Sequence, residues 1–168
     1  RAGTRNVGVI VPWIGLGGMD LIMLELARAM ADRPENRVHL MTSESGLLEM
    51  RASYATAFTT INPVPNSSYK EQTVRAFMED MDVLMIANSA TAFHYLPAVR
   101  ARTAPTTLVF IQNVDISADS LSVGFLYPLA RQYEGCIDGY VVPSRLTADQ
   151  IAGFGVPEHK IVVVPNAA

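Results

Sequence analysis

A glycine-rich stretch, residues 12–18, separates an apolar run from an amphipathic one near the start of the chain. Paired glycines let a backbone approach a ligand closely, and the amides that open a helix attract anions such as phosphate. The dinucleotide-binding fingerprint is not met, because Asp20 stands where it needs glycine or alanine, and a carboxylate there would repel a pyrophosphate. Two interpretations stay open for Gly17 and Gly18: a phosphate-facing loop, or a tight turn that needs glycine.

Polar side chains follow three later apolar runs. Asn88 and Ser89 come after one, Gln112 and Asn113 after the next, and Ser144 after a third. Amide and hydroxyl groups both donate and accept hydrogen bonds, which suits the hydroxyls of a sugar. Ser89 is better explained as a helix cap, whereas the sequence leaves a ligand role or a turn equally open around Asn113.

Trp13 lies beside the glycines in an apolar loop. An indole in such a place either packs into the core or stacks on a sugar or a partner domain, and the residues alone leave both open.

Composition excludes several classes of function. The net charge is −3 and the sequence shows no basic patch of the kind that binds nucleic acid. No stretch approaches the roughly 20 consecutive apolar residues that are needed to span a bilayer. The three histidines are far apart in the sequence, and Cys136 is the single cysteine, so we expect no metal site and no disulfide. A single cysteine is consistent with a reducing compartment, and we expect a cytoplasmic protein for which peripheral contact with a membrane stays open.

The elements that must position these residues alternate between two patterns. Apolar runs of strand length lie at residues 7–11, 37–42, 57–61, 83–87, 107–111, 140–142 and 161–164. Helical spacing lies at residues 20–32, 47–54, 68–80, 92–102, 121–133 and 144–153, with Pro97 at the start or in the middle of its helix. This alternation predicts an α/β fold, a doubly wound, mostly parallel sheet of six or seven strands with helices on both faces.

Open sheets of this kind bind ligands outside the carboxyl ends of their strands. We therefore predict a substrate-binding edge formed by Trp13, Gly17, Gly18, Asn88, Asn113 and Ser144. We assign no catalytic residue.

The last third of the chain carries a more specific pattern. Asp138, an apolar strand and Ser144 are followed, after a helix, by Gly155-Val156-Pro157, Lys160-Ile161 and a second strand that ends in Pro165-Asn166. This pattern resembles the corresponding stretch of group 1 (family 4) glycosyltransferases of the GT-B fold. Gly17-Gly18 with the helix after it, and the run from Asp82, resemble the double-glycine loop and the fourth strand of the same family.

The resemblance implies that residues 1–168 form the Rossmann-like, N-terminal, acceptor-side domain of a retaining enzyme. Such an enzyme transfers a sugar from a nucleotide sugar to an acceptor in carbohydrate biosynthesis, without a metal or other cofactor. The family often has histidines where this chain has Asn88 or Ser89 and Gln112-Asn113, and glycine where it has Ala167. The family's usual contacts to the sugar are therefore not all present.

The chain begins at Arg1 and stops just after a strand-like run. We accordingly expect the donor-binding, C-terminal domain to lie outside it, and the isolated chain to be inactive. The alternative is a non-catalytic Rossmann-like module that binds a carbohydrate or a protein.

Overall fold

The structure is a computed structural model that describes residues 3–15, 17–44, 52–64, 67–112 and 126–166. Strands and helices alternate along these residues. The elements are β1 (Arg5–Val11), α1 (Gly18–Ala31), β2 (Asn36–Thr42), α2 (Ala52–Ala57), β3 (Thr60–Pro63), α3 (Lys70–Glu79), β4 (Val83–Ala87), α4 (Ala90–Arg102), β5 (Thr106–Phe110), α6 (Leu126–Gln132), η1 (Glu134–Cys136), β6 (Gly139–Val142), α7 (Arg145–Gly153), η2 (Glu158–Lys160) and β7 (Ile161–Val163).

The seven strands form one sheet in the order β3-β2-β1-β4-β5-β6-β7, and every neighbouring pair is parallel. The prediction of a doubly wound parallel sheet of six or seven strands is confirmed. The chain winds from β1 toward β3 in one direction and from β4 toward β7 in the other. The order therefore reverses between β1 and β4, where an open sheet of this type has its ligand crevice.

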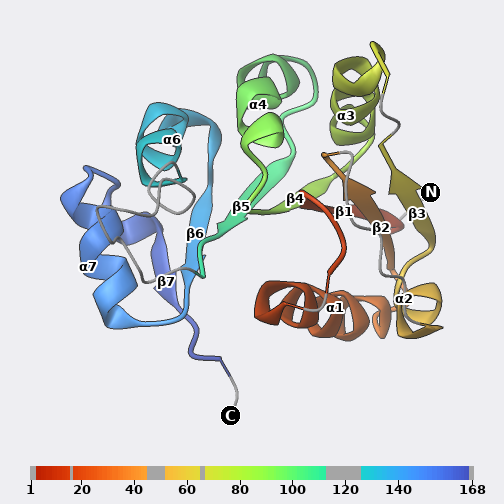
Figure 1. The fold of residues 1–168 in the computed structure, drawn as a ribbon, viewed down its shortest axis with the longest axis horizontal. Coiled ribbons are helices and arrows are strands. Elements are labelled where there is room, and N and C mark those ends of the chain that lie inside the picture. The colour runs from red at the N-terminus through yellow and green to blue at the C-terminus, as the bar shows by residue number, and fades with distance from the viewer. Residues whose placement is uncertain (1–2, 16, 45–51, 65–66, 113–125, 167–168) are drawn as a thin grey trace.

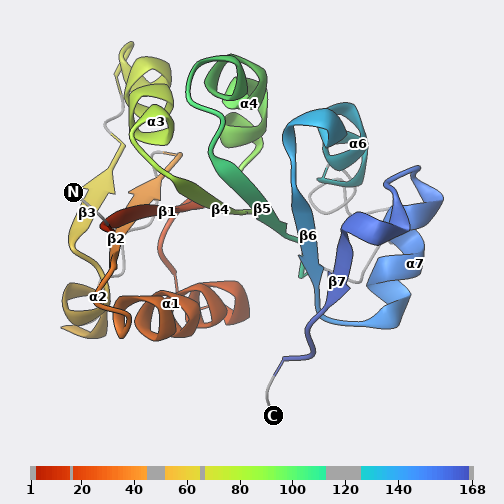
Figure 2. The ribbon, with the colours of Figure 1, turned by 180° about the vertical axis from the view of Figure 1, so that it is seen from behind.

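Helices cover the sheet on both faces, as the direction of winding requires. Helices α3, α4 and α6 lie on one face, and α1 and α2 lie on the other, as Figure 1 and the reverse view in Figure 2 show. Right-handed crossovers place the helices of the two windings on opposite faces. Because all the strands are parallel, each strand ends at the same carboxyl edge of the sheet. This edge holds the candidate site residues that the structure describes: Trp13, Gly17, Gly18, Asn88 and Ser144.

The core consists of two layers, one on each face of the sheet. The alternate residues Val7, Val9 and Val11 of β1 pack toward α1 and α2, whereas Ile10 packs on the α3 and α4 side. All four side chains are buried, which explains why this strand reads as a continuous apolar run and not as an alternating one.

Helix α1 begins two residues earlier than predicted. Gly17 is its N-cap and Gly18 its first residue, so Asp20 occupies the third helical position. The carboxylate caps the helix end, because Asp20 Oδ2 accepts hydrogen bonds from the amides of Gly15 and Gly17, each at 3.2 Å. A carboxylate in the first turn is also favourable for the helix dipole.

The segment before β3 departs most from the prediction. The strand expected at residues 57–61 runs instead from Thr60 to Pro63, because α2 extends through Ala57 and the Phe58 amide donates to the Tyr54 carbonyl at 3.2 Å. Residues 47–51 of the helix expected there lie outside the described residues, as do residues 121–125 of the helix now seen as α6. Pro97 lies in the middle of α4 at an exposed position.

Asp138 ties the start of β6 to its neighbours. Both of its carboxylate oxygens accept from the Arg100 guanidinium of α4 at 2.9 Å, and one also accepts from the Thr107 amide of β5 at 2.8 Å. Burial acts to raise the pKa of Asp138, but the bonds from Arg100 and Thr107 outweigh it and hold the pKa below its usual value. The aspartate of the C-terminal pattern therefore has a structural role.

This ion pair predicts a pH-dependent stability. A depressed carboxyl pKa stabilises the fold above the unfolded-state pKa of about 4, and this contribution disappears as the pH falls through the folded-state value. We expect Asp138→Asn to lower the free energy of unfolding at pH 7 by about 1 kcal/mol, a modest figure because solvent screens the pair. Urea unfolding of the wild-type chain and of the variant at pH 7 and pH 3 measures this difference in the free energy of unfolding. A difference between the two proteins that is equally large at pH 3 would contradict the prediction.

Candidate functional site

The ends of β1, β2 and β4 converge at the carboxyl edge. The Ser43 amide donates to the Val11 carbonyl at 2.8 Å and the Glu44 amide to the Pro12 carbonyl at 2.9 Å, so β1 and β2 stay paired beyond their last residues. The Ser89 hydroxyl, after β4, donates to the Ser43 hydroxyl at 2.6 Å, and neither residue is exposed. Three loops from distant parts of the sequence thus meet at the point where the strand order reverses.

The glycines that open α1 are not required by the fold itself. Gly17 has φ −76° and ψ 163°, which any residue adopts, and a Cβ there would meet only Asp20 Oδ2 at 3.5 Å. A Cβ on Gly18 would meet no atom within 4 Å, and Gly18 is exposed. The bare backbone at Gly18 therefore leaves room for close approach by a ligand, next to first-turn amides that have no partner within the helix.

Asp20 sets the electrostatics of this loop. Burial raises the pKa of the Asp20 carboxyl, and the hydrogen bonds from Gly17 and Gly15 act in the opposite direction without cancelling the effect. The carboxylate already occupies the amides of Gly15 and Gly17, so an anion would meet the amides that follow them along α1. The helix end can bind a phosphate at Gly18, although the nearby Asp20 carboxylate would repel it.

Trp13 projects from the loop after β1 with 49% of its surface exposed. A large aromatic side chain this exposed contributes little to the core, although a stable protein normally buries it. Its position favours the interpretation in which the indole faces a ligand or a partner domain.

Asn88 directly follows β4 and has a left-handed backbone, with φ 54°. Such a conformation is uncommon outside glycine, and asparagine is among the residues that tolerate it best. Its Oδ1 atom is buried, and no hydrogen-bond partner lies within reach. An unpaired buried oxygen is costly, so both features are typical of a residue held in place for a ligand.

Ser89 and Ser144 have local partners. Ser89 Oγ accepts from the Ala92 amide at 3.1 Å and caps α4, as the sequence favoured. Ser144 Oγ accepts from the Thr147 amide at 3.2 Å and caps α7, after β6. Because β5 separates β4 from β6, the structure does not bring Ser144 beside Asn88. Asn113 lies outside the described residues.

Glu44 is a candidate that the sequence analysis did not select. Its carboxylate accepts from the Thr91 hydroxyl at 2.5 Å and pairs with the Lys70 ammonium, which joins the end of β2 to the starts of α4 and α3. Its place directly after a strand was visible in the sequence, but the partners that hold it come from elements 26 and 47 residues away.

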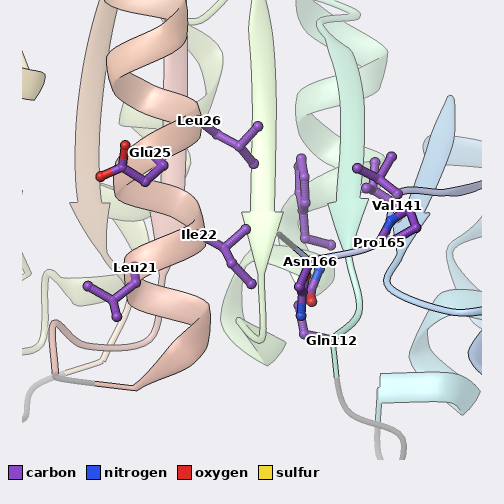
Figure 3. A pocket seen from close by; sticks show the side chains of 10 residues that line it. Leu21, Ile22, Glu25, Leu26, Gln112, Val141, Pro165 and Asn166 are labelled. Atoms are coloured by element: carbon purple, nitrogen blue, oxygen red, sulfur yellow. The ribbon is translucent and has the colours of Figure 1, made fainter. Parts of the chain in front are cut away.

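An apolar groove of about 550 Å³ begins one turn after Gly18, between α1 and the strands β5 and β6. Figure 3 shows Ile22 and Leu26 pointing from α1 toward Val141, Pro165 and Asn166. Gln112, which follows β5, also lines the groove, and its Oε1 atom is buried without a hydrogen-bond partner. The groove makes this part of the carboxyl edge apolar, whereas the ends of β2 and β4 are polar.

The histidines lie in separate surroundings. His39 contacts the Thr60 hydroxyl at 2.9 Å, His94 contacts the Ala90 carbonyl at 2.8 Å, and His159 lies in η2. Across the part of the chain that the structure describes, no three His, Cys, Asp or Glu side chains group as metal ligands would. None of the described helices combines the length and apolar character needed to cross a bilayer.

Comparison with known proteins gives one family. Residues 16–168 match the family described as Glycosyltransferase Family 4. No curated protein sequence matches the chain.

Solved structures share the fold at low sequence identity. HepE from Anabaena, solved in complex with UDP and glucose, is 13% identical with a TM-score of 0.65, and the match covers 98% of this chain and 45% of HepE. The lipopolysaccharide outer core galactosyltransferase WaaB is 12% identical with a TM-score of 0.67, over 98% of this chain and 46% of WaaB. A putative UDP-N-acetylglucosamine 2-epimerase from Listeria monocytogenes is 10% identical with a TM-score of 0.64, over 96% of this chain and 45% of the epimerase. The chain thus spans less than half the length of these proteins.

Proposed function

This chain belongs to glycosyltransferase family 4, and from that premise we propose that it is the acceptor-side half of a retaining glycosyltransferase. The complete enzyme transfers a hexose from a nucleotide sugar to an acceptor, and a second domain outside this chain binds the nucleotide. HepE, whose structure holds UDP and glucose, supports a uridine nucleotide sugar as the first donor to test.

The observation that carries this proposal is the open backbone at Gly18. A helix N-terminus with a bare first residue, at the edge where the strand order reverses, suits the diphosphate of a donor held across the cleft. As the sugar leaves, negative charge grows on that diphosphate, and oriented amides stabilise it without moving. Asn88 orients the sugar by hydrogen bonding, because an amide cannot relay a proton at neutral pH.

We propose that this chemistry needs no metal or other cofactor. The leaving diphosphate is stabilised by backbone amides here and by groups of the second domain, and catalysis rests on this and on positioning. Transfer by the complete protein should persist in excess EDTA, and the product should keep the anomeric configuration of the donor. We keep the cytoplasm as the proposed compartment, in line with the single cysteine.

Calorimetry tests which part of the protein binds the donor. The complete protein and this chain alone are each titrated with UDP-glucose. We expect micromolar binding by the complete protein and weak or no binding by the isolated chain, because micromolar affinity needs about 8 kcal/mol. Micromolar binding by the isolated chain would contradict the proposal. A complete protein that binds the donor but makes no glycoside would support instead a binding module, or an epimerase if the sugar is altered.

A further inference from the structure

We propose that this chain carries a second ligand site, near the amino edge of the sheet, which binds a free α-amino acid with an apolar side chain. The site is a cavity of about 440 Å³ between the starts of the first strands and the end of α3. We call it the amino-edge pocket. It lies away from the carboxyl edge that holds Gly18 and Asn88, so this inference does not depend on the proposed function.

Three adjacent strands supply a polar wall of the amino-edge pocket. Asn6, Arg37 and Thr60 are the first or second residues of β1, β2 and β3. His39 and Asn62 lie two residues further along β2 and β3. The strand register pairs Asn6 with Arg37 and His39 with Thr60, and side chains two residues apart on a strand share a face. All five side chains therefore belong to one face of the sheet.

The end of α3 supplies an apolar wall. Phe77 and Met81 line the pocket and lie against β1 at Gly8, where an added Cβ would be 2.6 Å from Met81 Cγ and 3.0 Å from Phe77 Cε1. The absence of a side chain at Gly8 thus lets an aromatic ring and a thioether reach the sheet beside the polar wall. These two groups offer apolar surface to the hydrocarbon part of a ligand.

One cation and one anion line the pocket without pairing with each other. Arg37 and Asp80 are both exposed, and neither side chain has an ion pair or a hydrogen bond within the part of the chain that the structure describes. Asn6 lies between them, because it is the register partner of Arg37 and its Nδ2 donates to the Asp80 carbonyl at 3.4 Å. Nearby Asp82 does not line the pocket, and its Oδ2 accepts from the Asn6 amide at 2.7 Å. The gap between Arg37 and Asp80 fits a ligand that carries both charges.

His39 adds no charge to this balance. Burial, and then the neighbouring Arg37, lower the pKa of the His39 imidazole, so the ring is neutral at pH 7. Its Nδ1 atom contacts the Thr60 hydroxyl at 2.9 Å, and that hydroxyl accepts from Asn62 Nδ2 at 2.9 Å. The pocket therefore has one positive and one negative group with neutral hydrogen-bonding groups beside them, which favours a zwitterion over a simple anion or cation.

A free α-amino acid meets all of these conditions at once. Its carboxylate pairs with the Arg37 guanidinium, whose planar fork suits a carboxylate, and its ammonium group pairs with the Asp80 carboxylate. Its side chain then lies against Phe77 and Met81, which favours an apolar one. Because both ion pairs are partly exposed to water, we expect a Kd of about 1 mM or weaker.

A titration followed by NMR tests the site in the 168-residue chain. The chain has three histidines, so the imidazole signal of His39 is readily followed and is assigned by its loss in His39→Gln. The probes are L-leucine, 4-methylpentanoate, which is leucine without its ammonium group, and 3-methylbutylamine, which is leucine without its carboxylate. We expect a saturable shift with L-leucine and binding about fivefold weaker for each of the other two, because each loses one ion pair. No saturable shift with L-leucine, or equal affinity for 4-methylpentanoate, would overturn the proposal.

Two substitutions then assign the charged groups. Arg37→Gln and Asp80→Asn should each raise the Kd for L-leucine about fivefold. In Arg37→Gln, L-leucine should bind no better than 3-methylbutylamine, because the carboxylate has lost its partner. The matched controls are Arg33→Gln and Asp32→Asn: both residues are exposed, neither lines the pocket, and Asp32 is the C-cap of α1 as Asp80 is of α3. Their Kd should not change. Thermal unfolding shows whether each variant is folded, and an unchanged Kd in folded Arg37→Gln or Asp80→Asn would overturn the assignment of that residue.

Discussion

Gly18→Val should lower kcat/KM of the complete enzyme by about 100-fold, or about 2.7 kcal/mol of transition-state stabilisation, while leaving the fold intact. The added side chain would fill the space through which the donor diphosphate reaches the first-turn amides of α1. The fold should tolerate it, because a Cβ at Gly18 meets no atom within 4 Å and the backbone is already helical. The measurement is a steady-state assay of sugar transfer together with thermal unfolding of the same preparation.

Gly153→Val is the matched control for this variant. Gly153 is also a helical glycine at which an added Cβ would meet nothing within 4 Å, but it ends α7 and so lies away from the carboxyl edge. Both variants should show similarly small changes of stability, because valine, although β-branched, is no worse a helix former than the glycine it replaces. Unchanged turnover in Gly18→Val, or an equal loss in both variants, would remove the glycine loop from the mechanism.

The fold was predictable because its strands are buried on both faces. The run that became β1 is apolar from Val7 to Val11 apart from Gly8, and only a strand covered by helices on two sides tolerates this in water. Boundaries were less predictable where tertiary packing decides them. Phe58 is an example, since its burial in the core beside Tyr54 favours continuing α2 over starting a strand.

The C-terminal pattern identified the family through residues that hold the fold together. Asp138 binds Arg100 and the Thr107 amide, and the Lys160 ammonium donates to the carbonyls of Glu134 at 3.1 Å and Ile137 at 2.9 Å. Both residues fix the ends of β6 and β7 relative to their neighbours. This explains why the pattern was specific for a fold and informative about a family, yet silent about the acceptor.

The candidate site was only partly predictable. The rule that ligands lie after the strands pointed to Trp13, Gly18 and Asn88, and these remain predictions with favourable geometry. The same rule applied to Ser144 finds a side chain engaged in capping α7. Glu44 was missed because its significance depends on Lys70 and Thr91, whose approach to the end of β2 is a property of the folded chain.

Gly8→Val should destabilise this domain clearly, for a reason opposite to that at Gly18. A Cβ on Gly8 would lie 2.6 Å from Met81 Cγ and 3.0 Å from Phe77 Cε1, where β1 passes beneath the end of α3. Overpacking of this kind costs about 1–3 kcal/mol, and the better strand propensity of valine offsets at most about 1 kcal/mol. We expect a net loss of about 2 kcal/mol, or a fall in Tm of roughly 4–8 °C for a chain of this size.

A double-mutant cycle with Met81→Ala shows whether the contact is the cause. Met81 is 9% exposed, so its truncation alone should also destabilise the chain. In the double variant the valine methyls occupy the space that the methionine leaves, so the combined loss should be smaller than the sum of the two single losses. Additive losses would mean that Met81 is not the neighbour responsible, and would point instead to the contact with Phe77 Cε1. Together with the result for Gly18→Val, the cycle distinguishes two kinds of glycine. At Gly8 core packing requires the absence of a side chain, whereas at Gly18 that absence leaves room for a ligand.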